Sequence, residues 1–184
     1  MFARGEYMKN VIVIGGGAAG LMAATISARN GNRVTVLEKN NRPARKVMIT
    51  GKGRCNVTNN CDNDTLIANV PKNPRFLYSA FSTFTAKDTM NFFEEAGVPL
   101  KTERGNRVFP VSDKAVDIVD ALVNTAKKSG VKIINATVKE IIADNSALSR
   151  VVCEDGSVFE ADSVILATGG MSYPVQVLRG TVLK

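Results

Sequence analysis

The stretch that decides the fold is residues 10–38, which read NVIVIGGGAAGLMAATISARNGNRVTVLE. It starts with a short β-branched run at 10–14 and then passes through a cluster of glycines. An Ala-, Leu- and Met-rich segment follows at 18–30 and stops at Gly31, and residues 33–38, RVTVLE, are then predicted to be a second buried strand. This order predicts strand, tight turn, helix and strand, a βαβ unit of about thirty residues.

The glycines have the spacing GxGxxG, at Gly15, Gly17 and Gly20. After a strand and before a helix, the first glycine permits the tight turn, the second lets a pyrophosphate approach the backbone, and the third lets helix and strand pack closely. The free amides at Ala18 and Ala19 would then face a diphosphate. Glu38, at the end of the second strand, is placed to accept hydrogen bonds from a ribose and disfavours a 2′-phosphate. The alternative is a plain glycine turn with an ordinary surface glutamate.

Composition narrows the chemistry around this motif. The 184 residues are 45% hydrophobic, enough for one domain with a core, and they include neither histidine nor tryptophan. Ser-His and Cys-His pairs and His-ligated metals are therefore excluded. The three cysteines are too few for a disulfide scaffold or a four-thiolate metal site. We expect no metal and a cytoplasmic location.

The positive charge is concentrated in the first part of the chain. Residues 1–75 contain 12 Lys and Arg against 4 Asp and Glu, whereas residues 76–184 contain 12 against 13. A small polyanionic ligand explains this asymmetry, as does a solvated basic face. Nucleic acid ranks low because the basic segment lacks interleaved aromatic residues. Residues 11–28 are uncharged but broken by four glycines, so we expect no membrane span, and residues 1–7 resemble a leader.

Later segments have mixed periodicity. Residues 40–63 are predicted to be a long functional loop, residues 76–84 and 87–96 helices, and residues 112–129 a helix capped by Ser112 or Asp113. Strands are predicted at 131–134 and 138–143, a hairpin at 151–160 and a last strand at 162–167. We found no repeat and no linker.

The end of the last strand discriminates between dinucleotides. Residues 164–170, VILATGG, form an apolar strand ending in Ala-Thr-Gly. Such a strand recurs in two-dinucleotide flavoproteins that resemble glutathione reductase in fold, where it returns to the cofactor. With the preceding hairpin and Val138, this layout favours FAD over a plain NAD-binding domain. A buried strand followed by a Gly-Gly turn is the alternative.

The loop at 44–59, ARKVMITGKGRCNVTN, resembles that of the BaiN-type flavoproteins, also called the aminoacetone-oxidase family. That family shows Arg-Lys followed by Ser-Gly-(Gly/Lys)-Gly-Arg-Cys-Asn-x-Thr-Asn, with Thr50 here in place of the serine. The resemblance extends through ERGNRVFP at 103–110, where Asn106 is additional, and ATGGMSYP at 167–174. It implies an FAD-dependent oxidoreductase with an unidentified small-molecule substrate and NAD(P)H as a candidate donor. The family continues into a substrate domain, so the resemblance covers only the N-terminal part.

The loop is chemically suited to a flavin dinucleotide. Arg45, Lys46 and Arg54 could neutralise a pyrophosphate, while glycine amides could approach the isoalloxazine and Asn56 its polar rim. Cys55 has three interpretations: a small apolar residue, a thiol touching the flavin, or half of a redox disulfide with Cys61, as in disulfide-reductase flavoproteins. No catalytic side chain is identified. The predicted cofactor-binding residues are Gly15, Gly17, Ala18, Ala19, Gly20, Glu38, Lys39, Arg45, Lys46, Gly51, Gly53, Arg54, Cys55, Asn56, Val138, Ala167, Thr168 and Gly169.

The predicted fold class is therefore α/β: a truncated Rossmann-like FAD-binding domain with a parallel sheet and a small antiparallel β-meander. The last residues, 175–184, depart from the family, which continues Thr-Gly-Ser-Thr-Gly-Asp-Gly after Pro174. A single DNA sequence can be written that encodes this tail in one reading frame and the family's Thr-Gly-Ser-Thr-Gly-Asp-Gly stretch in a shifted frame. We therefore expect residues 175–184 to be a frameshifted, non-native end, with a vector-derived tail as the alternative. A non-catalytic dinucleotide-binding fragment is the competing functional hypothesis.

Overall fold

The computed structural model describes residues 8–143 and 149–170, so both the expected leader and the expected non-native tail lie outside the described residues. The described residues divide into two compact units: unit 1 comprises residues 8–45, 122–143 and 149–170, and unit 2 comprises residues 46–121. Both boundaries fall inside helices, α2 (Arg45–Ile49) and α6 (Ala115–Lys128). A linker search could not reveal this division, because no Gly- or Pro-rich segment marks it.

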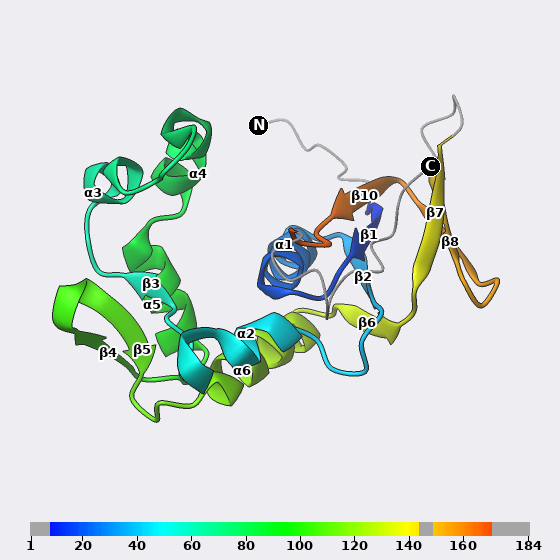
Figure 1. Cartoon of the computed structure of the whole chain (residues 1–184). Helices are drawn as coiled ribbons and strands as arrows, with labels where there is room; N and C mark the ends of the chain where they lie inside the picture. The colour runs from blue at the N-terminus through cyan, green and yellow to red at the C-terminus, as the bar shows by residue number, and fades with distance from the viewer. Residues whose placement is uncertain (1–7, 144–148, 171–184) are drawn as a thin grey trace, which may run out of the picture. The chain divides into compact units, whose positions relative to one another are not determined.

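Unit 1 is built on a parallel sheet of four strands (Figure 1). They are β1 (Asn10–Ile14), β2 (Arg33–Glu38), β6 (Lys132–Asn135) and β10 (Ser163–Leu166), in the order β10-β1-β2-β6. Residues 11–14 of β1 are all buried, which is why this strand reads as a continuous apolar run. Helix α1 (Ala18–Arg29) connects β1 to β2 and packs against both.

An antiparallel meander follows β6 in unit 1. It consists of β7 (Val138–Ala143), β8 (Ser149–Cys153) and β9 (Val158–Ala161), paired in that order. Its apolar residues share one hydrophobic core with Ile12, Ile14 and Leu37 of the parallel sheet. Gly156, with a φ of 85°, makes the predicted turn between β8 and β9. The predicted α/β fold, with a parallel Rossmann-like sheet and a meander, is confirmed.

Unit 2 contains short elements around a second antiparallel sheet, in the order β3-β5-β4. Its strands are β3 (Thr58–Asn59), β4 (Leu100–Glu103) and β5 (Arg107–Pro110). Its helices are α3 (Asn63–Ala68), α4 (Tyr78–Thr83) and α5 (Ala86–Glu95), with 3₁₀ turns η1 (Thr50–Gly53), η2 (Pro74–Leu77) and η3 (Arg104–Asn106). Most of α2 and the first half of α6 complete it.

The prediction of a long loop over 40–63 was wrong. That stretch contains α2, η1 and β3. These elements are too short for a periodicity window to detect, and β3 exists only through its pairing with β5, in which Thr58 opposes Val108 and Asn59 opposes Arg107. The segment predicted as one helix over 76–84 is η2 followed by α4. Among the described residues, no helix is long and apolar enough to cross a membrane.

Candidate functional site at the carboxyl ends of β1, β2 and β10

The glycine turn follows β1 directly and depends on the lack of side chains. Gly15 has a φ of 104°, and its N–H donates to the carbonyl of Leu37 at 2.9 Å. A Cβ at Gly15 would lie 2.5 Å from the carbonyl oxygen of Ala167, and one at Gly20 would lie 1.9 Å from the carbonyl oxygen of Gly15. The turn and the close packing of α1 on β1 therefore both require glycine.

The start of α1 presents unpaired backbone amides. Gly17 is the N-cap residue, its backbone is extended, and no side chain bonds to the helix terminus. A Cβ at Gly17 would meet nothing within 4 Å, and Ala18 and Ala19 are exposed. Because the first turn of a helix leaves N–H groups without internal partners and carries a positive dipole end, this terminus fits an anionic group such as a pyrophosphate.

Glu38 lies at the end of β2, where its carboxylate orders the glycine turn. The residue is only 7% exposed. Oε2 accepts the N–H of Gly16 at 2.6 Å, and Oε1 accepts the backbone N–H and side-chain amide of Asn40 at 2.8 and 2.6 Å. An ionised carboxylate has about four acceptor positions, so these three bonds leave room for one more donor, such as a ribose hydroxyl. The spacing of the motif did not identify Asn40 as a partner.

Strand β10 brings its following residues to the same edge of the sheet. It pairs with β1 in parallel, with Leu166 opposite Ile14, and the N–H of Ala167 donates to Ile14 at 2.8 Å. Thr168 and Gly169 follow and are exposed. Val138 differs because its side chain is 5% exposed and belongs to the hydrophobic core.

Basic residues also approach this edge. The N–H of Ala44 donates to the carbonyl of Gly16 at 2.8 Å, which places the start of α2, and so Arg45, next to the glycine turn. Arg45 is exposed, as is Lys39, the residue after Glu38. Unit 1 therefore combines a helix N-terminus, a carboxylate and two exposed cations at the carboxyl ends of its strands, where ligands bind in open α/β sheets.

Unit 2 holds the remaining predicted residues in loop 50–56. Gly51, Lys52, Gly53 and Cys55 all have left-handed backbone conformations, with φ of 56°, 57°, 84° and 60°. Asn56, with its amide oriented to satisfy its neighbours, donates to the carbonyls of Val108 and Thr58, so these bonds use its NH₂ group within the protein. Lys46, in α2, also belongs to this unit.

The cysteines of the loop region are free thiols. Cys55 is 6% exposed, and burial raises the pKa of its thiol. Cys61 is partly buried and unpaired as well, so no disulfide joins the two in this structure. These features agree with Cys55 as a small apolar residue rather than as a reactive thiolate.

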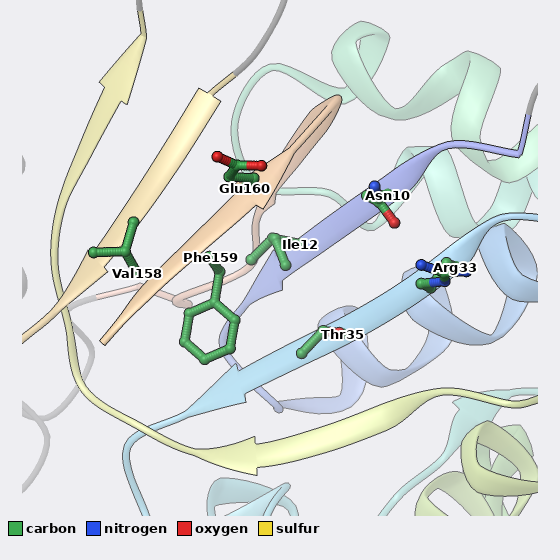
Figure 2. Close-up of a pocket in the computed structure, with 7 residues that line it drawn as sticks. All are labelled: Asn10, Ile12, Arg33, Thr35, Val158, Phe159 and Glu160. Carbon is green, nitrogen blue, oxygen red and sulfur yellow. The ribbon is translucent and has the colours of Figure 1, made fainter. Parts of the chain in front are cut away.

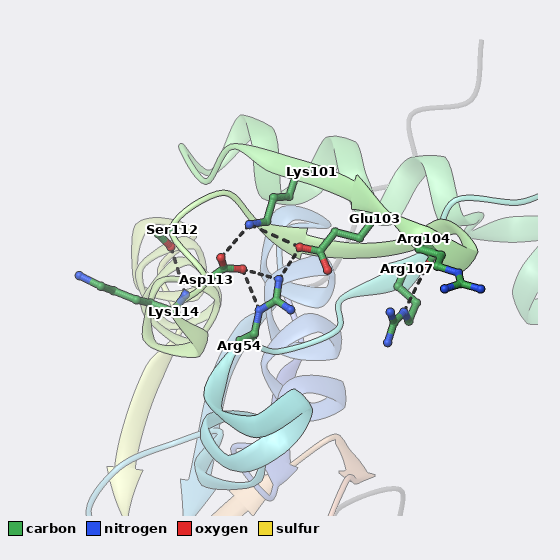
Figure 3. A network of polar contacts seen from close by, with 8 residues as sticks. All are labelled: Arg54, Lys101, Glu103, Arg104, Arg107, Ser112, Asp113 and Lys114. Atoms are coloured by element: carbon green, nitrogen blue, oxygen red, sulfur yellow. Dashed lines mark hydrogen bonds and ion pairs between the residues drawn. The ribbon is translucent and has the colours of Figure 1, made fainter.

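Arg54 has two acidic partners inside unit 2. Its guanidinium, which the sequence predicts to neutralise a pyrophosphate, bonds to Glu103 and Asp113 (Figure 3), and the contact with a pyrophosphate stays a prediction. The two carboxylates neutralise its charge locally. They are 49 and 59 residues away in the chain, so no local motif could have indicated them.

A cavity of about 460 Å³ lies elsewhere in unit 1, between the parallel sheet and β9 (Figure 2). Asn10 and Arg33, which line it, are the first residues of β1 and β2. It therefore lies toward the amino ends of these strands, whereas the glycine turn follows the carboxyl end of β1. Because dinucleotides bind at the carboxyl ends, we place the candidate site at the turn rather than in this cavity.

Comparison with known proteins agrees with this geometry. The sequence model for the HI0933-like protein Rossmann domain matches residues 9–177. A 3-dehydro-bile acid delta(4,6)-reductase of Clostridium scindens is 34% identical over 89% of this chain and 39% of its own length. A ribosomal RNA dihydrouridine synthase of Escherichia coli is 30% identical over 90% of this chain and 40% of its own. The chain thus spans about two-fifths of the length of these relatives.

A solved structure supports the fold. The 3-ketosteroid-delta4-(5alpha)-dehydrogenase from Rhodococcus jostii RHA1 superposes with a TM-score of 0.66 and 18% sequence identity, over 92% of this chain and 47% of that one. At this identity the likeness concerns the fold alone.

Proposed function

The chain belongs to the HI0933-like Rossmann domain family, whose members are FAD-dependent oxidoreductases, and from this we propose that unit 1 binds the ADP portion of FAD at the glycine turn. The observation that carries the proposal is the start of α1, which has no side-chain cap and at which Ala18 and Ala19 are exposed residues. Glu38 and Gly169 lie at the same edge of the sheet.

The residues present fit this cofactor. Amides at Gly17, Ala18 and Ala19 would bind the pyrophosphate, with Arg45 and Lys39 supplying positive charge. The free acceptor position of Glu38 would take a ribose hydroxyl. When bound, FAD supplies the redox chemistry, accepting electrons and passing them on. We propose that Thr168 and Gly169 contact the flavin side of the dinucleotide.

Unit 2 would contribute through loop 50–56 and Lys46. A Cβ at Gly53 would meet nothing within 4 Å, which leaves room for a ring to approach the loop there, and we propose that this loop, including Gly51, contacts the isoalloxazine edge. No side chain is assigned a catalytic role. The thiol of Cys55 is buried, and burial raises its pKa, which supports a packing role.

The whole protein is proposed to be a cytoplasmic reductase that uses NAD(P)H. The two relatives are described as a bile-acid delta(4,6)-reductase and a dihydrouridine synthase. Both descriptions concern reduction of a carbon–carbon double bond in a ring, and this is the reaction class that we propose. We propose a small-molecule substrate rather than an RNA nucleotide, because the basic segment lacks interleaved aromatic residues, and competition between the two in an activity assay tests this choice.

The experiment titrates the purified 184-residue chain with FAD and follows flavin fluorescence and the visible spectrum. We expect quenching, and competition by ADP but much weaker competition by NADP⁺, because Glu38 repels a 2′-phosphate. Binding of NAD(H) without binding of FAD would contradict the flavin assignment. NAD(P)H oxidation by this chain is expected to be absent or very slow, as the fragment hypothesis also requires. Fast steady turnover would contradict that hypothesis.

A further inference from the structure

Arg54 carries the inference that goes furthest beyond the cofactor site. We propose that Arg54 is a positioning residue: through Glu103 and Asp113 it holds loop 50–56 in the left-handed conformation with which the loop contacts the flavin. The inference rests on the proposed function, since it assigns a role to the loop that we propose as the contact to the isoalloxazine. It replaces the direct bond from Arg54 to a pyrophosphate.

The contacts of Arg54 form one closed set (Figure 3). Nε and Nη2 donate to Oδ1 of Asp113 at 2.8 and 2.6 Å, and Nη2 also reaches Oε1 of Glu103 at 2.5 Å. Lys101 pairs with the same two carboxylates, at 2.7 Å to Asp113 and 3.5 Å to Glu103. We call Arg54, Lys101, Glu103 and Asp113 the Arg54 network. Two cations and two anions balance, so the network offers no net positive charge to a phosphate.

An aromatic ring links this network to the loop. The guanidinium carbon of Arg54 lies 4.2 Å from the ring centre of Phe109, within the range of a cation–π contact. Phe109 is 4% exposed, and its Cε1 atom lies 3.5 Å from where a Cβ at Gly51 would be. The ring therefore packs between the loop backbone and the Arg54 guanidinium.

The loop needs such support because its backbone is unfavourable. Lys52 and Cys55 are non-glycine residues with φ near 60°, a conformation that L-residues rarely adopt. Arg54 lies between Gly53 and Cys55, so its side chain anchors the strained part directly. Its partners come from β4 and from the turn before α6, both in unit 2. If the anchor is removed, the loop can relax while the rest of unit 2 stays folded.

The first test uses the thiols of the chain as reporters. Cys55 lies in the loop and is 6% exposed, while Cys153 lies in unit 1 and is 2% exposed. Labelling with a thiol reagent, resolved by mass spectrometry, is compared for wild type, Arg54→Ala and Arg54→Lys. We expect Cys55 to be labelled about tenfold faster in Arg54→Ala than in wild type, with the rate at Cys153 unchanged. A change of about tenfold is what the loss of two ion pairs and one cation–π contact together would cause. Arg54→Lys should recover part of the protection.

The second test separates positioning from direct binding. ADP probes unit 1 alone, whereas the flavin spectrum probes the ring. We expect Arg54→Ala to bind ADP as tightly as wild type but to lose most of the flavin spectral shift. If Arg54→Ala bound ADP more weakly than wild type, Arg54 would contact the pyrophosphate directly, and the inference would be overturned.

Other outcomes also decide the matter. An unchanged Cys55 labelling rate in Arg54→Ala overturns the inference. Equal acceleration at Cys55 and Cys153, in this variant and in the milder Asp113→Asn, would mean that the network stabilises the whole chain, and this too overturns it. Failure of the wild type to bind FAD would contradict the proposed function instead, while Cys55 labelling would still report whether Arg54 anchors the loop.

Discussion

The two units reach unusual backbone geometry by opposite means. In unit 1, the turn at Gly15 exists because side chains are missing, and its neighbours are backbone atoms of Ala167 and Leu37. In unit 2, loop 50–56 exists beside a network of charged side chains centred on Arg54. A turn packed against backbone should be insensitive to salt and intolerant of any added atom. A loop anchored by exposed ion pairs should tolerate small changes and respond to pH and salt.

The helix starts of the two units show the same contrast. Helix α5 has a capping box, in which Thr85 accepts the N–H of Asp88 and Asp88 accepts the N–H of Thr85. Its first amides are satisfied within the protein. Helix α1 has Gly17 at the corresponding position and no capping side chain. The first terminus is capped by side chains, and the second has no such cap, which fits the phosphate site that we propose there.

The largest effect is expected at Gly20. Gly20→Ala puts a Cβ 1.9 Å from the carbonyl oxygen of Gly15, and backbone on both sides cannot yield. We expect a loss of about 3 kcal/mol or more in the free energy of unfolding, and no FAD binding. Urea unfolding measures the first and fluorescence titration the second. Gly17→Ala is the control, because its Cβ meets nothing within 4 Å, and it should cost at most about 1 kcal/mol.

The next effect is expected at Glu38. Glu38→Ala leaves the buried N–H of Gly16 without its acceptor, which costs roughly 1–3 kcal/mol. Glu38→Gln keeps one acceptor oxygen and should lose less stability. Both variants should weaken ADP binding, because neither can accept from Gly16, Asn40 and a ribose together. Equal ADP affinity in wild type and Glu38→Gln would show that Glu38 only orders the turn.

A smaller effect, confined to unit 2, is expected on acidification. The hydrogen bond from Arg54 lowers the pKa of Glu103, and that from Lys101, followed by that from Arg54, lowers the pKa of Asp113. When folding lowers the pKa of a carboxyl group, the ionised group stabilises the folded state. This stabilisation is complete above the ordinary pKa, about 4, and is lost as the pH falls through the lowered pKa of the folded state. Below about pH 4, labelling of Cys55 should therefore accelerate relative to labelling of Cys153. Each labelling rate is first corrected for the fraction of that thiol that is ionised at the pH of the measurement.

Two controls sharpen this pH test. Asp113→Asn should flatten the acid dependence, because one of the two titrating partners is removed. High salt at neutral pH should accelerate Cys55 labelling as acid does, but less strongly, since the side chain of Asp113 is 43% exposed and its ion pairs are screened. If the pH profile of Cys55 labelling were identical in wild type and Asp113→Asn, the Arg54 network would not be the cause of the acid dependence.

The same difference between the two units explains how much of the fold could be predicted from the sequence. In unit 1, the predicted strands at 10–14 and 33–38 match β1 and β2, because buried parallel strands read as apolar runs and the glycine spacing is fixed by contacts within the motif. In unit 2, β5 ends in Pro110 and β4 reads LKTE, so neither shows a clear apolar alternation. Their pairing comes from partners distant in sequence.

Asp113 illustrates the limit at the level of one residue. Its position before a helix predicted a cap, and α6 indeed begins two residues later, at Ala115. In the structure its carboxylate instead accepts from Arg54 and Lys101, 59 and 12 residues away. Local spacing can show that a carboxylate is near a helix start. It cannot show that two distant cations compete for it.

The smallest change in stability, and the one that separates stability from function, is expected for Gly17→Ser. Gly17 already has the extended backbone of an N-cap residue, with φ of −73° and ψ of −178°, and open space for a side chain. A serine hydroxyl there would accept the N–H of Ala19 or Gly20, so the free energy of unfolding should rise by a few tenths of a kcal/mol. The same bond takes an amide that the pyrophosphate needs, so FAD and ADP affinity should fall by about threefold to tenfold. Thr85→Ser in the capping box of α5 is the matched control, with little change in either quantity. If Gly17→Ser bound ADP as tightly as wild type, the amides at the start of α1 would not be the phosphate site, and the contrast between the two helix starts would reduce to a difference in capping alone.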